Sequence, residues 1–266
     1  MDSVATENLD DQRFYLRQNV PAVIGHRGAA RYAPENTLAS VRKAHELGVQ
    51  WVEVDVKLSA DRIPFLLHDT KLDRTTDGRG RASRRTMKEL SVMDAGSWFA
   101  AASRGERLPT LVALIALLDR LDMGLNLEIK PTPGSDRETT DAVVDVLRRH
   151  WPEHRPWPLL SSFSLVALAR ARDIAIDMPR GLLIDKFMRD WPGALDELQC
   201  ASLHINHKVV TPDLLSTATE EGIPVLLYTV NDGSRAVELL QAGASSIITD
   251  APDVIFDAIG GTAPLR

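Results

Sequence analysis

Short apolar segments alternate with longer amphipathic segments along most of this chain. Residues 21–25 form the first apolar run, which leads into His26 and Arg27. Apolar residues then recur at helical spacing from Asn36 until Gly48, and this pattern predicts a helix after the first strand. The same alternation of a short run and a longer amphipathic stretch recurs toward the C-terminus.

The apolar runs predict eight strands, and the segments between them predict helices. The predicted strands cover residues 21–25, 51–56, 125–129, 159–162, 181–184, 201–205, 225–230 and 246–249. The later helices are predicted near residues 111–121, 138–149, 165–171, 194–198, 213–221 and 235–241. Eight strand–helix units in roughly 250 residues are typical of a TIM (β/α)8 barrel. An open doubly wound sheet is the alternative, but no glycine-rich dinucleotide motif follows the first strand.

Residues 63–67 predict one additional strand. Only residues 58–62 separate it from the strand before, and a parallel crossover needs about a dozen residues, so this pair is predicted to be an antiparallel hairpin. Residues 69–108 then form a polar segment that is too long for a plain connection. We therefore predict a single domain over residues 1–266, an α/β TIM barrel with an extra hairpin strand and an insertion at 69–108.

Composition narrows the class of protein. The 266 residues carry 31 Lys+Arg and 37 Asp+Glu, a net charge of −6, which argues against binding to nucleic acid or anionic membranes. The single cysteine, Cys200, excludes an intrachain disulfide and indicates a reducing compartment. The first residues lack the basic and apolar regions of a secretory signal. We expect a cytoplasmic protein with no nucleic-acid partner and no stable membrane association.

Carboxylates lie at the ends of two predicted strands. Glu53 and Asp55 are two residues apart and therefore share one face of a strand, and Glu128 shares a face with Lys130 in the same way. In a barrel these strand ends meet at one mouth. Desolvated carboxylates need cationic partners or a metal, and oxygen ligands favour Mg²⁺ or Ca²⁺. A purely structural network with Lys130 or an arginine is the alternative.

Two histidines end apolar runs at the same mouth. His26 follows the first strand, and the hairpin strand carries His68 to the end where residues 51–56 exit. Two imidazoles beside one anion can act as general base and general acid. Arg27 can bind a phosphate through two hydrogen bonds, and Lys130 adds a second positive charge. This set suits cleavage of a phosphodiester.

These residues lie in motifs that resemble the glycerophosphodiester phosphodiesterase family. The matching stretches are HRG at 26–28, PENT at 34–37, EVDVKLS at 53–59, LHD at 67–69, LDRTT at 72–76, EIKP at 128–131, SSF at 161–163, YTVN at 228–231 and ITD at 248–250. Each stretch is weak alone, but their order and spacing together are specific. Within the family the chain is most similar to the cytosolic bacterial enzyme linked to glycerophosphodiester uptake, through RGLL at 180–183 and HINHK at 204–208.

The resemblance implies a TIM barrel that hydrolyses small glycerophosphodiesters, such as glycerophosphocholine, to sn-glycerol 3-phosphate and an alcohol. It implies catalytic histidines at His26 and His68 and a divalent cofactor. The implied metal ligands are Glu53, Asp55 and Glu128. The implied phosphate-binding residues are Arg27 and Lys130. Tyr228, which we expect to bind the substrate, stands where the family often has Trp, a departure that bears on the shape of the alcohol pocket but not on the chemistry.

Three alternatives remain at this stage. A phospholipase or lyase of the same fold would act on intact or lyso-phospholipids, and Trp98 and Phe99 in the 69–108 segment are a weak candidate for membrane docking. An aldolase-like enzyme would form a Schiff base on Lys130. A non-catalytic glycerophosphodiester-binding protein would need a broken acid–base pair, whereas both His26 and His68 are present.

Overall fold

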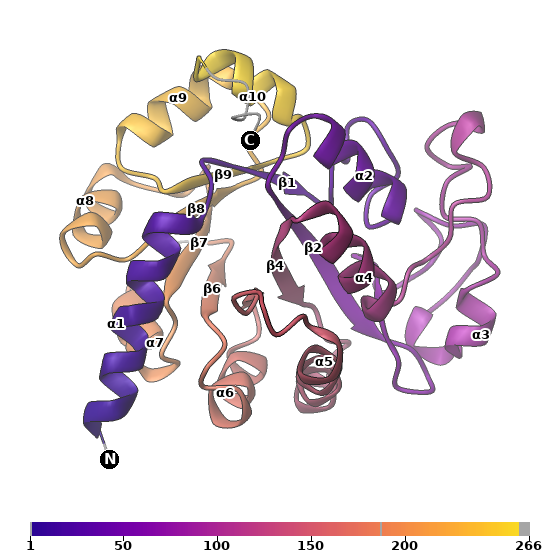
Figure 1. Cartoon of the computed structure of the whole chain (residues 1–266), viewed down its shortest axis with the longest axis horizontal. Coiled ribbons are helices and arrows are strands. Elements are labelled where there is room, and N and C mark those ends of the chain that lie inside the picture. The colour runs from indigo at the N-terminus through magenta and orange to yellow at the C-terminus, as the bar shows by residue number, and fades with distance from the viewer. Residues whose placement is uncertain (1, 187, 261–266) are drawn as a thin grey trace.

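Eight parallel strands close into a barrel in the computed structural model, which describes residues 2–186 and 188–260 (Figure 1). They are β1 (Val23–His26), β2 (Trp51–Leu58), β4 (Gly124–Ile129), β5 (Leu159–Ser162), β6 (Arg180–Ile184), β7 (Ser202–Asn206), β8 (Val225–Tyr228) and β9 (Ser246–Thr249). β1 pairs with both β2 and β9, which closes the ring. The predicted TIM barrel is confirmed, and the open sheet is excluded.

Helices follow the strands and surround the barrel (Figure 1). They are α2 (Leu38–Glu46), α4 (Leu111–Leu121), α5 (Asp136–His150), α6 (Leu165–Ile174), α7 (Trp191–Glu197), α8 (Pro212–Glu220), α9 (Gly233–Gln241) and α10 (Pro252–Ala258). In α4 the Thr110 side chain caps the first turn by accepting the Ala113 N–H, and Leu114 and Leu118 are fully buried against the sheet. The sequence analysis predicted each of these helices except α10, within a few residues at the ends.

The predicted hairpin is also confirmed. β3 (Pro64–Leu66) runs antiparallel to β2, with Leu66 opposite Val56. Residues 69–108 then extend beyond the strand ends (right in Figure 1) and contain η1 (Ala82–Arg84), α3 (Met87–Leu90) and η2 (Ala101–Ser103). Phe65 and Leu72 pack in a small apolar cluster with residues of this segment, so the segment is anchored to β3.

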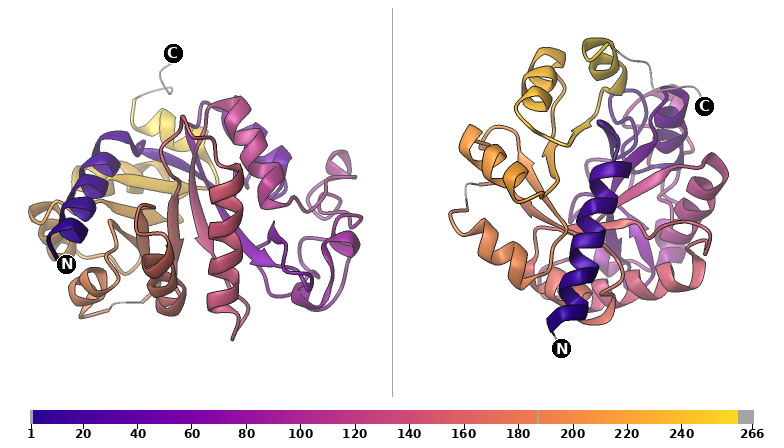
Figure 2. Two further views of the ribbon diagram at one scale, coloured as in Figure 1. Left: turned by 60° about the horizontal axis from the view of Figure 1, so that its bottom comes forward. Right: turned by 60° about the vertical axis from the view of Figure 1, so that its left-hand side comes forward.

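One helix without a sequence prediction lies at the opposite end of the barrel. Helix α1 (Asp2–Asn19) places the fully buried Leu16 against Trp51 and Leu159, which lie at the first residues of β2 and β5. Figure 2 shows α1 and the 69–108 segment on opposite sides of the molecule. The N-terminal end of the barrel is therefore covered by α1, and the C-terminal end stays accessible. Within the described ranges, none of the helices has the length and apolar character needed to cross a membrane.

Candidate active site

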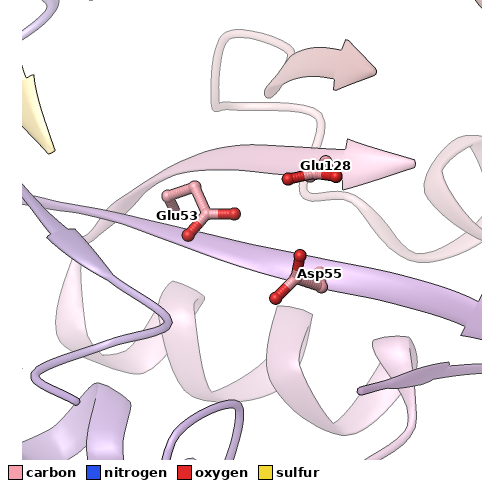
Figure 3. A group of neighbouring side chains, drawn as sticks. All are labelled: Glu53, Asp55 and Glu128. Carbon is pink, nitrogen blue, oxygen red and sulfur yellow. The ribbon is translucent and has the colours of Figure 1, made fainter. Parts of the chain in front are cut away.

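Strand register brings the acidic residues together at the C-terminal end of the barrel. His26 lies beside Glu53 across β1 and β2, and Asp55 lies beside Glu128 across β2 and β4. One oxygen from each of Glu53, Asp55 and Glu128 lies within 4.8 Å of the others (Figure 3). These residues are only 4%, 1% and 7% exposed, respectively. We call Glu53, Asp55 and Glu128 the acid trio.

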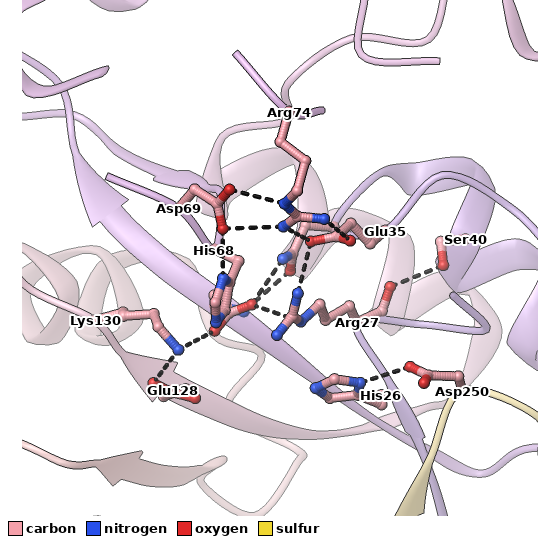
Figure 4. Close-up of polar contacts among 12 residues, drawn as sticks. His26, Arg27, Glu35, Ser40, His68, Asp69, Arg74, Glu128, Lys130 and Asp250 are labelled. Carbon is pink, nitrogen blue, oxygen red and sulfur yellow. Dashed lines mark hydrogen bonds and ion pairs between the residues drawn. The ribbon is translucent and has the colours of Figure 1, made fainter. Parts of the chain in front are cut away.

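Two cations contact the acid trio (Figure 4). Lys130 Nζ donates to Asp55 Oδ1 at 3.0 Å and to Glu128 Oε1 at 2.8 Å. The Arg27 backbone N–H donates to Glu53 at 3.1 Å, and its Nε lies 3.2 Å from Asp55 Oδ2. The two residues predicted to bind phosphate are thus already paired with carboxylates in the free protein.

The pKa values of the trio show that the two cations do not fully balance it. Burial, together with the neighbouring carboxylates, raises the pKa of Glu53 well above its usual value. Burial, with Asp55 as the next cause, raises the pKa of Glu128 to about 7. Burial would also raise the pKa of Asp55, but Lys130 and Arg27 outweigh it and hold that pKa below its usual range.

The acid trio fits a divalent ion. The trio offers the oxygen atoms of three buried carboxylates to one ion, and hard cations such as Mg²⁺ and Ca²⁺ prefer oxygen ligands. Burial is the main cause of the raised pKa values of Glu53 and Glu128, and a bound cation would stabilise the ionised form of both. Zn²⁺ favours nitrogen and sulfur ligands, which the trio does not offer.

Each pocket histidine has a carboxylate at the same ring nitrogen. His26 Nδ1 lies 2.6 Å from Asp250 Oδ1, and His68 Nδ1 lies 2.7 Å from Asp69 Oδ1 (Figure 4). An ionised carboxylate only accepts hydrogen bonds, so Nδ1 carries the proton in both rings. The Nε2 atoms are then left to exchange protons with a ligand. His26 Nε2 lies 3.9 Å from Glu53 Oε2, at the edge of the trio.

A cavity of about 240 Å³ opens where these groups meet. Its walls include seven of the eight residues that the sequence analysis selected: His26, Arg27, Glu53, His68, Glu128, Lys130 and Tyr228. Asp55 lies beneath it, fully buried, and bonds Lys130. The structure therefore brings all eight selected residues into one site.

Several residues of this site were not selected from the sequence. Asn36, which has a left-handed φ of 57°, donates from Nδ2 to Asp55 Oδ2 at 2.8 Å and accepts the Asp55 N–H. Arg74 bonds both oxygens of Asp69 and both oxygens of Glu35. Glu35 in turn accepts from Arg27 at 2.7 Å. Glu35 and Asn36 belong to the PENT motif and Arg74 to the LDRTT motif, and these motifs were the only indication of them in the sequence.

The state of Lys130 argues against the aldolase alternative. Burial would lower the pKa of Lys130, but Asp55 and Glu128 outweigh burial and raise it. A Schiff-base lysine must lose its proton to attack a carbonyl. A doubly paired ammonium group is poorly suited to that reaction.

Comparison with known proteins identifies the family of this chain. Residues 26–254 match the model of the "Glycerophosphoryl diester phosphodiesterase family". A glycerophosphodiester phosphodiesterase of Caldanaerobacter subterraneus is 31% identical, and the match covers 89% of this chain and 97% of that protein. One of Bacillus subtilis is 27% identical over 87% of this chain and 84% of that protein.

A solved structure supports the same assignment. A phosphodiesterase of Oleispira antarctica, in complex with the product sn-glycerol-3-phosphate, superposes with a TM-score of 0.88 and 41% identity. The match covers 90% of this chain and 97% of that one. The chain described here therefore belongs to the glycerophosphoryl diester phosphodiesterase family.

Proposed function

We propose that this chain hydrolyses glycerophosphodiesters to sn-glycerol 3-phosphate and a free alcohol. One observation carries the proposal: two imidazoles, each with a carboxylate at Nδ1, face a single cavity that also contains carboxylates of the acid trio. Family membership and the product named in the Oleispira antarctica complex support the choice of substrate.

We infer that Glu53, Asp55 and Glu128 hold a divalent cation, Mg²⁺ or Ca²⁺. Such an ion would supply positive charge beside a phosphate oxygen and so favour attack at phosphorus. Arg27 and Lys130 are the cations that we assign to the phosphate, and Tyr228 to the substrate pocket. The guanidinium suits two parallel bonds to phosphate oxygens, whereas the ammonium acts as a point charge.

The two histidines would move the protons. The nucleophile, either water or the 2-hydroxyl of the substrate glycerol, loses its proton to one Nε2 while its oxygen bonds to phosphorus. The bond from phosphorus to the alcohol oxygen breaks, and the other imidazolium gives its Nε2 proton to that oxygen. Attack by the 2-hydroxyl gives a cyclic phosphate, which water then opens to glycerol 3-phosphate.

We assign His26 as the base and His68 as the acid. The reverse order also satisfies the geometry, and one property favours it. Burial lowers the pKa of His68, and with Arg27 and Lys130 it outweighs the opposing charge of Asp55 and the hydrogen bond to Asp69, so the neutral ring is favoured at pH 7. A neutral imidazole is the form that a base requires.

A coupled assay for glycerol 3-phosphate tests the function. We expect turnover of glycerophosphocholine that chelator abolishes and Mg²⁺ or Ca²⁺ restores. His26→Ala and His68→Ala should each lose at least ~10²-fold in kcat, as expected for a general acid or base. The exposed His45→Ala is the matched control and should keep wild-type turnover. Near-wild-type turnover in either pocket variant would reject the two-histidine scheme.

A nitrophenyl ester of glycerol 3-phosphate assigns the two roles. Nitrophenolate leaves without receiving a proton, so the variant that lacks the acid should regain most of its activity on this substrate. The variant that lacks the base should stay inactive. Regained activity in His68→Ala alone supports the assignment above, and regained activity in His26→Ala alone reverses it.

One feature favours a second candidate, activity on lyso-phospholipids. Phe163 at the cavity rim and Leu165 and Val166 at the start of α6 are 42%, 45% and 49% exposed. An acyl chain could cover these apolar side chains. Lysophosphatidylcholine in the same assay decides between the substrates, since a higher kcat/KM than for glycerophosphocholine would favour this candidate.

Three further predictions from the sequence remain predictions: a single domain with residues 69–108 as its insertion, a cytoplasmic location, and small molecules rather than nucleic acid or membranes as partners. Fractionation of cells that express the full chain would test its location.

A further inference from the structure

Beyond the phosphate-binding residues, the cavity continues along an aromatic wall. Phe163 follows the end of β5, and its ring centroid lies 5.6 Å from Lys130 Nζ. The Tyr228 ring stands edge-on to Phe163, with centroids 6.0 Å apart and planes at 90°. The Tyr228 hydroxyl donates to the Ile184 carbonyl at 2.7 Å, which fixes the ring against the end of β6.

This wall ends at a carboxylate. Asp185 follows directly after Ile184, lines the same cavity and is exposed. Its Oδ1 accepts a hydrogen bond from Asn206 Nδ2, at the end of β7, at 2.9 Å. Asp185 and Tyr228 are close enough for the carboxylate charge to raise the pKa of the phenol, after burial, which is the larger cause. Contacts thus link Lys130 to Phe163, Phe163 to Tyr228, and Tyr228 to the end of β6 beside Asp185, all on the wall of one cavity.

Asp185 adds a further negative charge to a cavity that, under the proposed function, binds an anionic phosphate. Lys130 and Arg27 are paired with the acid trio, and within the described ranges no lysine or arginine side chain forms an ion pair with Asp185. A negative charge near the phosphate therefore weakens the binding of any ligand that is only anionic. It strengthens the binding of a ligand that carries a positive charge at the far end.

We propose that Asp185, with Phe163 and Tyr228, forms the subsite for the leaving alcohol and selects a cationic amino alcohol. The inference rests on the proposed function and names its preferred substrates: phosphodiesters of choline or ethanolamine rather than of uncharged polyols. An alkylammonium group is attracted both to aromatic rings and to a carboxylate. The phosphate and the ammonium group of such a zwitterion would then meet Lys130 and Asp185 at opposite ends of one wall.

Substrate selectivity tests the assignment. The coupled assay gives kcat/KM of the metal-saturated full chain for glycerophosphocholine and for glycerophosphoglycerol, whose headgroup is uncharged. Asp185→Asn keeps the shape and the bond from Asn206 but removes the charge. We expect the choline-to-glycerol ratio of kcat/KM to fall by about fivefold to tenfold, the size of one screened charge pair. Asp185→Lys should lower the ratio further.

Asp213→Asn, an exposed residue of α8, removes the same charge away from the cavity and should leave the ratio unchanged. A ratio that Asp185→Asn does not change would overturn the inference. An equal loss on both substrates has the same meaning, because it would show that Asp185 binds the glycerol half that both share. If the wild-type chain cleaves neither ester, the proposed function fails and the inference fails with it.

Discussion

The cavity histidines depend on carboxylates that do not themselves line the cavity. Asp250 holds His26, and Asn231 holds Asp250, by donating to its second oxygen at 2.7 Å and accepting its N–H. Asp69 holds His68, and Arg74 bonds Asp69 through two nitrogens. Each imidazole is thus oriented by a partner that is itself oriented.

Arg74 is the residue whose loss should reveal this dependence. It bonds both Asp69, five positions away, and Glu35, 39 positions away, at distances of 2.7–3.0 Å. Arg74→Ala should lower kcat by roughly 10-fold to 100-fold, the usual size of a lost hydrogen bond to a charged group, while KM changes less. The exposed Arg79→Ala of the same segment is the control. Equal kcat in both variants would mean that Asp69 keeps its position unaided.

At this scale the sequence allowed the residues that meet at the cavity to be selected, but not the residues that hold them in place. Glu53, Asp55, Glu128 and Lys130 could be selected because each lies at a predicted strand end, where barrel geometry directs side chains to one mouth. Arg74 and Asn36 lie in irregular segments, where no periodicity indicates which way a side chain points. Their contacts form only when distant loops meet.

At the scale of elements, α1 is the clearest example of a helix that the hydrophobic pattern of the sequence did not predict. Its sequence is mostly polar, so it lacks the broad apolar face that identifies a surface helix. Its main apolar contact is Leu16, which is fully buried among the first residues of several strands. The helix is therefore specified by the open end of the barrel rather than by its own periodicity.

Leu16→Ala should remove most of that contact. We expect it to lower the free energy of unfolding by about 2–5 kcal/mol, the range for truncating a buried leucine. Phe14→Ala in the same helix, where Phe14 is 60% exposed, should change it by less than about 0.5 kcal/mol. Urea unfolding measures both. If the two variants unfold alike, α1 does not stabilise the barrel through Leu16.

At the scale of the whole molecule, the acid trio sets stability against function. Burial and mutual repulsion make it costly to keep all three carboxylates of the trio ionised, so without a cation they destabilise the folded chain. Glu53→Gln replaces one of these ionisable groups with a neutral amide. In chelator at neutral pH it should therefore raise the free energy of unfolding by about 1–2 kcal/mol.

With saturating divalent metal the order should reverse, because the wild-type chain gains about 2.7 kcal/mol at 100 times Kd and the variant gains less. Glu153→Gln, at an exposed loop position, is the control. Thermal unfolding with and without metal tests both halves. If metal stabilises Glu53→Gln as much as it stabilises the wild-type chain, Glu53 is not a metal ligand.

A buried histidine inside the barrel should make stability depend on pH. Burial lowers the pKa of His204 to about 3, whereas in the unfolded chain it titrates near 6.5. Between these values the unfolded chain binds the extra proton, so His204 makes stability fall as pH falls from about 6.5 toward 3, by at most ~1.4 kcal/mol per pH unit. His204→Leu should flatten that part of the stability curve, whatever its effect on absolute stability. An unchanged slope would contradict this.

The barrel as a whole was the most predictable level. Eight buried parallel strands give eight separate apolar runs, and the short spacing before residues 63–67 identified the hairpin. The ends of elements were less predictable. β2 was expected to end at residue 56 but continues to Leu58, because pairing with β3 extends it.

The contact between His26 and Asp250 joins the first strand to the residue after the last. Parallel pairing of β1 with β9 brings this ring to its acceptor. The acid trio lies on the neighbouring strands β2 and β4 and does not depend on that pairing. Opening the seam between β1 and β9 would therefore separate the His26 imidazole from Asp250 while leaving the three carboxylates together.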